Sequence, residues 1–342
     1  MSTSIALRSL VFAAAFSAAL AAQDIPIEVI LSPFDQDDFT SDTSASRGLV
    51  MGDFNGDDFL DVFVANFNQQ DNELFLNDGN GGWDKVTTGP LVNDGSHSRG
   101  AAAGDVDNDG DLDIFVANGG SQVNSLWINQ GGVQGGTEGD FLPITSGDIT
   151  EDMAFSRNAS FADIDGDGDL DLFVANTGDE NNFLYLNENG EFVRVTTGPV
   201  VSDGGTSHEG VFGDVDGDDD IDLFVPNGSG VVGGQGAVNF LYLNDGAGNF
   251  TRATDGDALT AVFNTKCASL GDWDDDGDLD LFTGNNQGQK NRLYENDGNG
   301  IFTDTAHPDL TEGRGETHDT DRADRDSDGR LLSDFMMLIP GL

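Results

Sequence analysis

An Asp-rich segment of ten residues recurs six times along the chain, and this repeat constrains the fold more than any other feature. It reads GDFNGDDFLD from Gly52 and GDVDNDGDLD from Gly104, and its last copy, ADRDSDGRLL from Ala323, is degraded. The leading aspartates are separated by steps of 52, 58, 51, 58 and 52 residues. A period of roughly 50 residues is typical of propellers and repeat arrays. The leading aspartates are Asp53, Asp105, Asp163, Asp214, Asp272 and Asp324.

Each repeat also carries the signals of four short strands. A run such as VFVAN follows the Asp-rich segment, and a motif Asn-x-Leu-aromatic-x-Asn comes next, as in NELFLN from Asn72. A Gly-rich turn then leads to an aromatic residue such as Trp83. Apolar and polar residues alternate with the period of two that sheets require, and long helical periodicity is absent. The sequence therefore predicts an all-β fold, a β-propeller of four-stranded blades.

The blade count follows from the number of complete repeats. Five blades are predicted to be complete, and a partial sixth has only a first strand, its loop and an apolar run from Leu331 to Ile339. Residues 25–31 (IPIEVIL) resemble an outer strand, and we expect them to pair with the last blade and close the ring. The sixth blade would still be a strand short. The sequence therefore predicts a propeller of the six- or seven-bladed type.

The complete loops have the form Asp-x-Asp/Asn-x-Asp-x-x-x-Asp, with side-chain oxygens at positions 1, 3, 5 and 9. Oxygen ligands packed this closely suit Ca²⁺, whereas Mg²⁺ prefers a strict octahedron and Zn²⁺ prefers His or Cys. An EF-hand needs a Glu at position 12 and a following helix, but position 12 here falls in a predicted strand. We expect about five Ca²⁺ sites. Their ligands are Asp53, Asn55, Asp57 and Asp61; Asp105, Asp107, Asp109 and Asp113; Asp163, Asp165, Asp167 and Asp171; Asp214, Asp216, Asp218 and Asp222; and Asp272, Asp274, Asp276 and Asp280.

A set of solvated Asp-Gly turns is the alternative, since both residues commonly form turns. Five copies in one register favour a metal, because carboxylates packed into nine residues repel one another without a counter-ion. The sixth loop keeps Asp324, Asp326 and Asp328, but Leu332 replaces its final Asp and Arg330 stands at position 7. We expect this loop to bind weakly or not at all.

The loops, with the Asn-x-Leu-aromatic-x-Asn and Gly-x-Phe elements, resemble FG-GAP/VCBS repeats, as found in integrin α propellers and many exported bacterial proteins. The resemblance covers about Ser44 to Asp334. It implies a bladed propeller with Ca²⁺ in hairpin loops on one face, and roles in adhesion and recognition. The incomplete sixth blade and Asn55 in the first loop depart from the pattern. These departures bear on the blade count and leave the fold unchanged.

A basic or titratable residue stands six positions before every leading aspartate, although the chain has only 14 Lys and Arg and 4 His. This position opens the first strand of each blade. Because the innermost strands of a propeller line its channel, these side chains could form a positive ring that binds a carboxylate, a sulfate or an acidic sugar. Alternatively, each could pair with a loop aspartate and hold the loop in place. The residues are Arg47, Arg99, Arg157, His208, Lys266 and His318.

The composition limits the classes of binding partner, and the N-terminal segment indicates the cellular location. The chain has 63 acidic and 14 basic residues, a net charge of −49, and lacks the basic footprint that nucleic acid or an anionic membrane requires. Residues 1–22 are typical of a signal peptide, with Arg8, an apolar run and a small-x-small site at Ala19 to Ala21. We therefore expect export to a secreted, cell-surface or periplasmic location without membrane insertion, and a propeller over residues 23–342.

The sequence contains no nucleophile elbow, no HExxH and no phosphate-binding loop. It predicts a non-enzymatic calcium-binding module that acts in binding, adhesion or scaffolding for an extracellular protein or an acidic glycan. A monomer is expected, because closed propellers leave few sheet edges. Two alternatives stay open: a polysaccharide lyase or hydrolase acting on acidic polysaccharide, and a purely structural cell-surface repeat protein.

Overall fold

A computed structural model describes residues 44–131, 135–137, 139–229 and 234–305, together with the strand pairs 322–323 and 335–336. The predicted signal peptide, the run 25–31, the sixth Asp-rich loop and His318 lie outside these described residues. Within the described part of the chain, no helix has both the length and the apolar character needed to cross a membrane.

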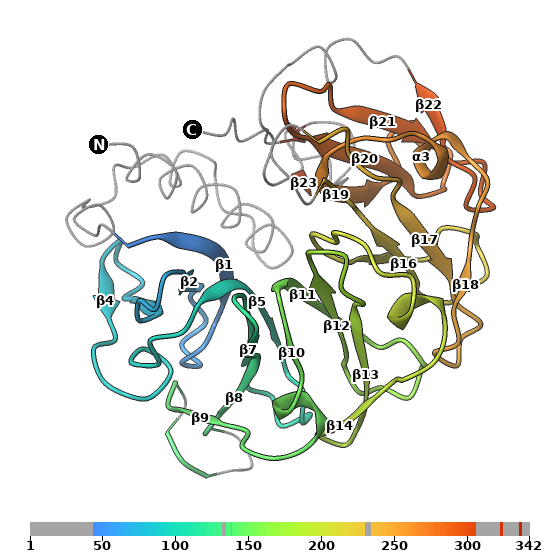
Figure 1. Cartoon of the computed structure of the whole chain (residues 1–342). Helices are drawn as coiled ribbons and strands as arrows, with labels where there is room; N and C mark the ends of the chain where they lie inside the picture. The colour runs from blue at the N-terminus through green and yellow to red at the C-terminus, as the bar shows by residue number, and fades with distance from the viewer. Residues whose placement is uncertain are drawn as a thin grey trace. The chain divides into compact units, whose positions relative to one another are not determined.

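Five four-stranded antiparallel sheets form, one for each complete repeat, and each sheet has its strands in chain order (Figure 1). We refer to them as blades one to five. Blade one contains β1 (Ser46–Gly52), β2 (Asp61–Asn66), β3 (Glu73–Asn77) and β4 (Trp83–Lys85). Blade two contains β5 (Ser98–Gly104), β6 (Asp113–Asn118), β8 (Ser125–Asn129) and β9 (Phe141–Pro143). Blade three contains β11 (Ser156–Ala162), β12 (Asp171–Asn176), β13 (Phe183–Glu188) and β14 (Glu191–Arg194). Blade four contains β15 (Val211–Gly213), β16 (Asp222–Val225), β17 (Phe240–Leu243) and β18 (Thr251–Arg252), and blade five contains β19 (Thr265–Gly271), β20 (Asp280–Asn285), β21 (Arg292–Glu295) and β22 (Thr303–Thr305).

The five predicted four-stranded repeats are therefore confirmed. The short pair β23 (Arg322–Ala323) and β24 (Phe335–Met336) is antiparallel and stands where the sequence predicts the partial sixth blade. Within the described residues, the remaining elements are two short strands and three single-turn helices: β7 (Gln122–Val123), β10 (Met153–Ala154), η3 (Asp148–Thr150), η4 (Pro199–Val201) and α3 (Asp257–Thr260). The chain divides into two compact units, Met1–Met153 with blades one and two, and Ala154–Leu342 with blades three to five.

In four of the five described blades, the first strand carries a β-bulge at the same register position. In blade one, Ser46 pairs with Asn66 and Gly48 pairs with Ala65, which leaves Arg47 as the extra residue. A bulge bends the strand and redirects the side chain of the extra residue. The same irregularity leaves out one residue of the first strand in three further blades, namely Arg99, Arg157 and Lys266.

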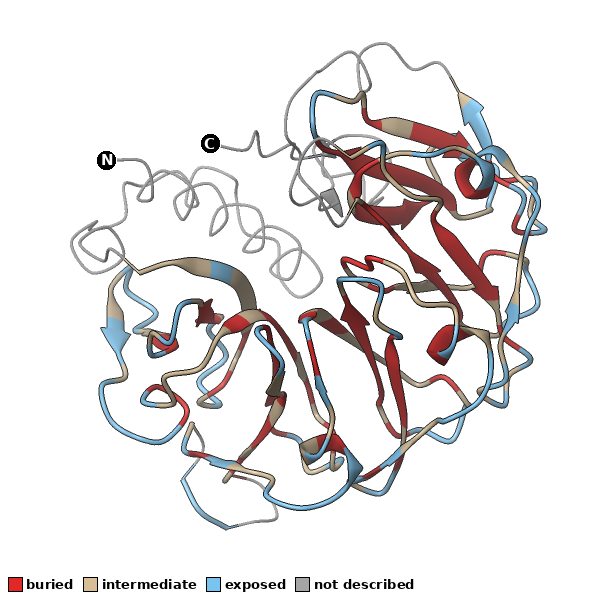
Figure 2. Cartoon of the chain, in the orientation of Figure 1, coloured by how far each residue is buried: buried red, intermediate tan, exposed pale blue. Residues whose placement is uncertain are grey.

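Within each unit the core lies between neighbouring blades, and the second strand of each blade is its most buried part (Figure 2). In blade four, Phe224 packs towards blade five, whereas Leu223 packs towards blade three. Both faces of this strand are thus covered, which explains why it reads as a continuous apolar run and departs from the predicted alternation. The fourth strands β4 and β22 are largely exposed.

Candidate metal centres

Each of the five described Asp-rich loops connects the first strand of a blade to its second, and the aspartate at position 1 folds the loop around itself. In the third loop, Asp163 Oδ1 accepts the N–H of Gly166 at 2.9 Å and its Oδ2 accepts the N–H of Gly168 at 3.1 Å. Both glycines have positive φ, 74° and 96°, a conformation that glycine adopts without steric cost. Asp167, at position 5, accepts the N–H of Asp169 at 2.9 Å. These local bonds aim the loop carboxylates at one point.

In four of the loops, three carboxylates converge so that one oxygen of each lies within 4.8 Å of the others. Two position-3 oxygens, Asp165 Oδ1 and Asp216 Oδ1, are buried and have no hydrogen-bond partner among the described residues. Burial, followed by the charge of the neighbouring loop aspartate, raises the pKa of both carboxyls above the usual value. The trios are Asp105, Asp107 and Asp113; Asp163, Asp165 and Asp167; Asp214, Asp216 and Asp218; and Asp272, Asp274 and Asp276.

A buried carboxylate oxygen without a donor is costly, and a cation would satisfy it. The donor set consists of carboxylate oxygens alone, which suits a hard cation and does not suit zinc. The residues present therefore fit a metal ion in these four loops. The three converging carboxylates of each loop would provide the negative charge that binds the cation. The backbone hydrogen bonds to the aspartate at position 1 would hold the loop in its folded conformation.

The aspartate at position 9 has a second role that the sequence analysis missed. Asp171 is fully buried at the start of β12, and both of its carboxylate oxygens accept backbone N–H groups. Its Oδ2 binds Ile164 N at 2.8 Å and its Oδ1 binds Asn187 N at 2.7 Å. All five complete repeats have this pair of bonds, from the second loop residue and from the last Asn of the Asn-x-Leu-aromatic-x-Asn motif.

Position 9 thus joins the loop to the third strand, and only in the second loop does it also belong to the converging trio, as Asp113. Burial is the main cause that raises the pKa of Asp113 to about 7 and the pKa of Asp171 to about 6, while the backbone donors oppose it. In the remaining trios, positions 1, 3 and 5 converge. The position-5 residue Asp109 of the second loop lies outside its trio.

The first loop differs from the others. Asn55 stands at position 3, where its Nδ2 donates to Asp57 Oδ2 at 3.2 Å and its Oδ1 accepts the N–H of Asp57 at 3.1 Å. Among the described residues, Asp53, Asp57 and Asp61 do not form a converging trio. Because the Asn55 amide is uncharged, the carboxylates of this loop repel one another less than those of the other loops. The hydrogen bonds between Asn55 and Asp57 close the loop.

The last Asn of the same motif also connects one blade to the next. Asn129 Nδ2 donates to the carbonyl of Phe54 in the preceding loop at 3.0 Å, and Asn244 and Asn296 do the same to Ile164 at 2.7 Å and Val215 at 2.8 Å. The second residue of a loop is thus held through its N–H by its own blade and through its carbonyl by the next blade. The repetition of this Asn in every motif was the signal that could have revealed its role.

The structure places four of the five described residues of the predicted basic ring in two pairs. The guanidinium carbons of Arg47 and Arg99 lie over the ring of Phe67, at 5.6 and 4.9 Å from its centroid. His208 Nε2 lies 2.9 Å from Lys266 Nζ. Arg157 is half-buried at the bulge of β11. In the described residues, neither Arg47 nor Arg99 forms an ion pair with a loop aspartate.

Four stretches of the chain match one family of repeats, at residues 53–116, 105–174, 163–225 and 272–331, and together they span more than half of the chain. The chain belongs to the FG-GAP-like repeat family. Each matched FG-GAP-like repeat begins at the leading aspartate of a loop. The unmatched residues 226–271 include a longer connection in blade four, where Asn227 N binds Asn239 twelve positions on, against six in blade one. No curated protein matches the chain.

Solved structures with a similar fold extend this finding. A lectin from Agrocybe aegerita that recognises non-reducing terminal N-acetylglucosamine is 18% identical, with a TM-score of 0.55 over 84% of this chain and 73% of the lectin chain. A protein from Lactobacillus plantarum is 13% identical, with a TM-score of 0.50 over 76% and 70% of the two chains. An α-L-arabinanase from Penicillium chrysogenum is 12% identical, with a TM-score of 0.48 over 82% and 86%. At these identities the likeness concerns the fold alone. The family match, the four-stranded sheets and the likeness to the lectin confirm the predicted β-propeller.

Proposed function

We propose that this FG-GAP-like repeat protein is an exported β-propeller, stabilised by Ca²⁺, that binds an extracellular protein or an acidic glycan and has no catalytic activity. The observation that carries the proposal is the converging trio of aspartates, which recurs in the Asp-rich loops of four described blades. Oxygen-ligand sites that recur in several blades are more typical of structural metal sites than of a single catalytic site.

Calcium would act on the free energy of unfolding. Metal-free loops hold several carboxylates within a few ångströms of one another, and two of them have a buried oxygen without a donor. A bound cation removes this repulsion in the folded state only, because the ligands separate when the chain unfolds. Extracellular calcium modules bind with dissociation constants of about 10⁻⁴ to 10⁻³ M. The protein would therefore be loaded where calcium is abundant, which agrees with export.

The fold supports a binding role. The Agrocybe aegerita lectin with a similar propeller recognises a terminal sugar. A propeller presents loops from every blade at its ends, and such loops provide recognition surfaces on a rigid scaffold. Backbone N–H groups donate hydrogen bonds to the loop carboxylates, as they do to Asp163, Asp167 and Asp171. We therefore assign these carboxylates to the scaffold and not to general acid–base catalysis.

The experiment that tests the calcium proposal is a thermal melt in 1 mM CaCl₂, in 1 mM MgCl₂ and in excess EGTA. A site with a dissociation constant of about 10⁻⁴ M adds about 1.4 kcal/mol at this concentration, so four sites add about 6 kcal/mol. For a chain of this size we expect a rise of roughly 10 °C or more in Ca²⁺ over EGTA. Equal midpoints in all three solutions would contradict the proposal.

Export and the absence of catalysis have separate tests. N-terminal sequencing of the protein secreted by an expression host should begin near residue 23. Incubation with pectin or alginate should leave the ultraviolet absorbance unchanged, because a lyase would create an absorbing double bond. A steady rise in absorbance that depends on the protein would establish the polysaccharide lyase instead.

A further inference from the structure

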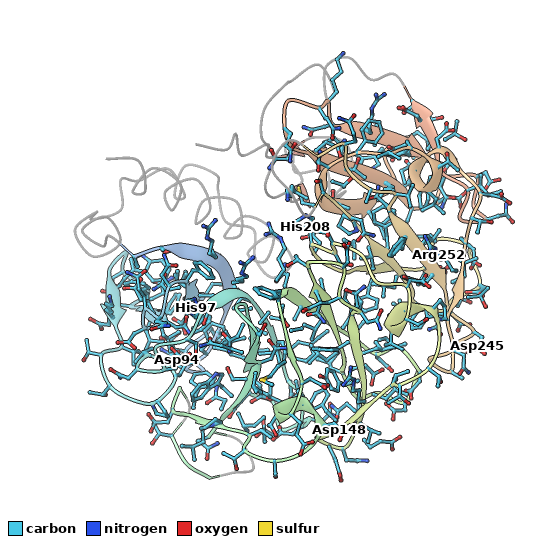
Figure 3. The ribbon with its side chains drawn as sticks, in the orientation of Figure 1. Asp94, His97, Asp148, His208, Asp245 and Arg252 are labelled. Carbon is cyan, nitrogen blue, oxygen red and sulfur yellow. The ribbon has the colours of Figure 1, made fainter. Side chains whose placement is uncertain are left out.

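Two arginines on the first strands of blades one and two form a cluster with two aromatic rings. Arg47 is exposed on β1 and Arg99 is half-buried on β5, and both guanidinium groups lie over Phe67, which directly follows β2. The ring of His97, which is labelled in Figure 3, packs edge-on against Phe67, with the ring centroids 5.1 Å apart. We call these four residues the arginine cluster. A cation over an aromatic face is attracted by the ring, which orients both guanidinium groups.

The backbone brings the two arginines together by the same device on both strands. Each arginine is the extra residue of a β-bulge, and bulges often redirect a side chain beside a functional site. Each is followed by a glycine. A Cβ built on Gly48 would lie 2.6 Å from Gly100 Cα, so side chains larger than hydrogen would force the two strands apart. Two adjacent Arg-Gly pairs therefore place two like charges close together.

This proximity is unfavourable in the protein alone. Burial and the charge of Arg47 lower the pKa of Arg99. Arg99 Nε and His97 Nδ1 are buried and have no hydrogen-bond partner among the described residues. The chain has 63 acidic residues against 14 basic ones, yet in the described residues no carboxylate forms an ion pair with either arginine. Groups held in an unfavourable arrangement by the fold are typical of a preorganised ligand site.

We propose that Arg47 and Arg99 form a clamp that binds the carboxylate of a sugar acid in a sparsely charged glycan. This proposal rests on the binding function proposed above and narrows it to one site and one ligand class. Arginine presents its N–H donors as a planar fork, which matches the two oxygens of a carboxylate. Bound between the two forks, the carboxylate neutralises the repulsion that the free protein bears.

The overall charge of the protein decides what kind of anion can reach the clamp. A net charge of −49 repels extended polyanions such as nucleic acid or a heavily sulfated chain, and each further negative charge on the ligand increases this repulsion. A glycan with one uronate among neutral sugars brings a single charge. It gains the two arginine contacts with the least repulsion from the remaining surface.

The test is isothermal titration of glucuronic acid, glucose and sulfate into the calcium-loaded full-length mature protein and into Arg47→Gln and Arg99→Gln. Arg194→Gln is the matched control, because Arg194 also lies over a phenylalanine, at 4.6 Å from the centroid of Phe183, and its loss removes the same charge. We expect the wild type and Arg194→Gln to bind glucuronic acid in the millimolar range and not glucose. Each cluster variant should lose at least tenfold in affinity.

Thermal melts without ligand separate a clamp from a structural role. Removal of one of two repelling charges should leave the melting temperature of Arg99→Gln equal to or above that of the wild type. A clear fall would make the arginine a structural residue and overturn the proposal. Arg47 is exposed, so Arg47→Gln provides the same test should Arg99→Gln fail to fold.

Other outcomes also decide the matter. Wild-type protein that binds no glucuronic acid, or that binds sulfate more tightly, overturns the clamp or its ligand class. Binding of an acidic glycan that both cluster variants retain overturns the clamp and leaves the proposed binding function intact. Melts that show no effect of Ca²⁺ contradict the calcium proposal and leave the glucuronic acid measurement unaffected.

Discussion

The hydrogen bond between neighbouring blades can be measured by comparing two asparagines of the same motif. Asn129 is fully buried, and its Nδ2 donates to Phe54 O at 3.0 Å in blade one and to Leu112 O at 3.3 Å in its own blade. Its Oδ1 accepts the N–H of Gly139 at 2.8 Å. The change Asn129→Ala removes all three bonds from a dry environment.

Asn77 is the matched control, because it occupies the same motif position in blade one. Its Nδ2 donates to Leu60 O at 3.3 Å and its Oδ1 accepts the N–H of Gly79 at 3.0 Å, both within its own blade, and it is only half-buried. A hydrogen bond contributes about 1 kcal/mol net, and a buried group left without its partner costs about 1–3 kcal/mol. We therefore expect Asn129→Ala to lower the free energy of unfolding by about 3 kcal/mol and Asn77→Ala by about 1 kcal/mol.

The assay is guanidinium-induced unfolding in saturating CaCl₂, followed by tryptophan fluorescence. The difference of about 2 kcal/mol corresponds to roughly 3 °C in melting temperature for a chain of this size. The slope of the transition should stay the same, which would show that the variants differ in stability and not in compactness. Equal losses in the two variants would refute the reasoning, because the bond to Phe54 would then contribute nothing.

Three further predictions concern the loops and the strand contacts. In EGTA, Asp171→Ala should lower the free energy of unfolding by about 2–3 kcal/mol, because two buried N–H groups lose their acceptor. Asp167→Ala should lower it by less than about 1 kcal/mol. The reverse order in chemical denaturation would contradict the structural role of Asp171 between the loop and the third strand. The metal-free protein should lose stability as pH rises from 5 to 8. Burial raises the pKa of Asp113 from 3.8 to about 7 in the folded state, so the folded protein binds this proton more tightly than the unfolded chain does. The stability that this difference provides is lost when Asp113 ionises in the folded state. Saturating Ca²⁺, which binds the ionised form, should abolish this slope in melts across the pH range, and a slope of the opposite sign in EGTA would contradict the assignment. Gly48→Ala should cost about 2 kcal/mol or more, since its Cβ would meet the Gly100 backbone at 2.6 Å, and an unchanged melting temperature would show that β1 and β5 can separate freely.

The agreement between sequence and structure is best where the pattern is local. The Asp-rich loop, the apolar second strand and the Asn-x-Leu-aromatic-x-Asn motif recur with a fixed spacing, and each complete repeat forms four antiparallel strands. Three loop aspartates also converge in each of four described repeats, because backbone bonds from residues two to five positions away organise the loop.

The disagreements arise where one side chain can serve two partners. Asp171 looks like a metal ligand in the sequence, and its burial and two backbone donors show that it also braces the third strand. The alternation expected of the second strand is absent, because Leu223 and Phe224 pack against different neighbouring blades. Neither outcome is visible in a motif, since both depend on the elements that surround it.

By itself the sequence determined the number of complete repeats, the four strands of each and the position of the oxygen-rich loops, because these follow from contacts within about 50 residues of chain. Only the tertiary structure decided that Asn129 reaches the Phe54 carbonyl 75 residues away, and that Arg47 and Arg99 share one aromatic ring. Such contacts depend on which strands become neighbours and on the bulges and glycines that let them approach. A side chain's partner across two blades is a consequence of packing, which no local pattern encodes.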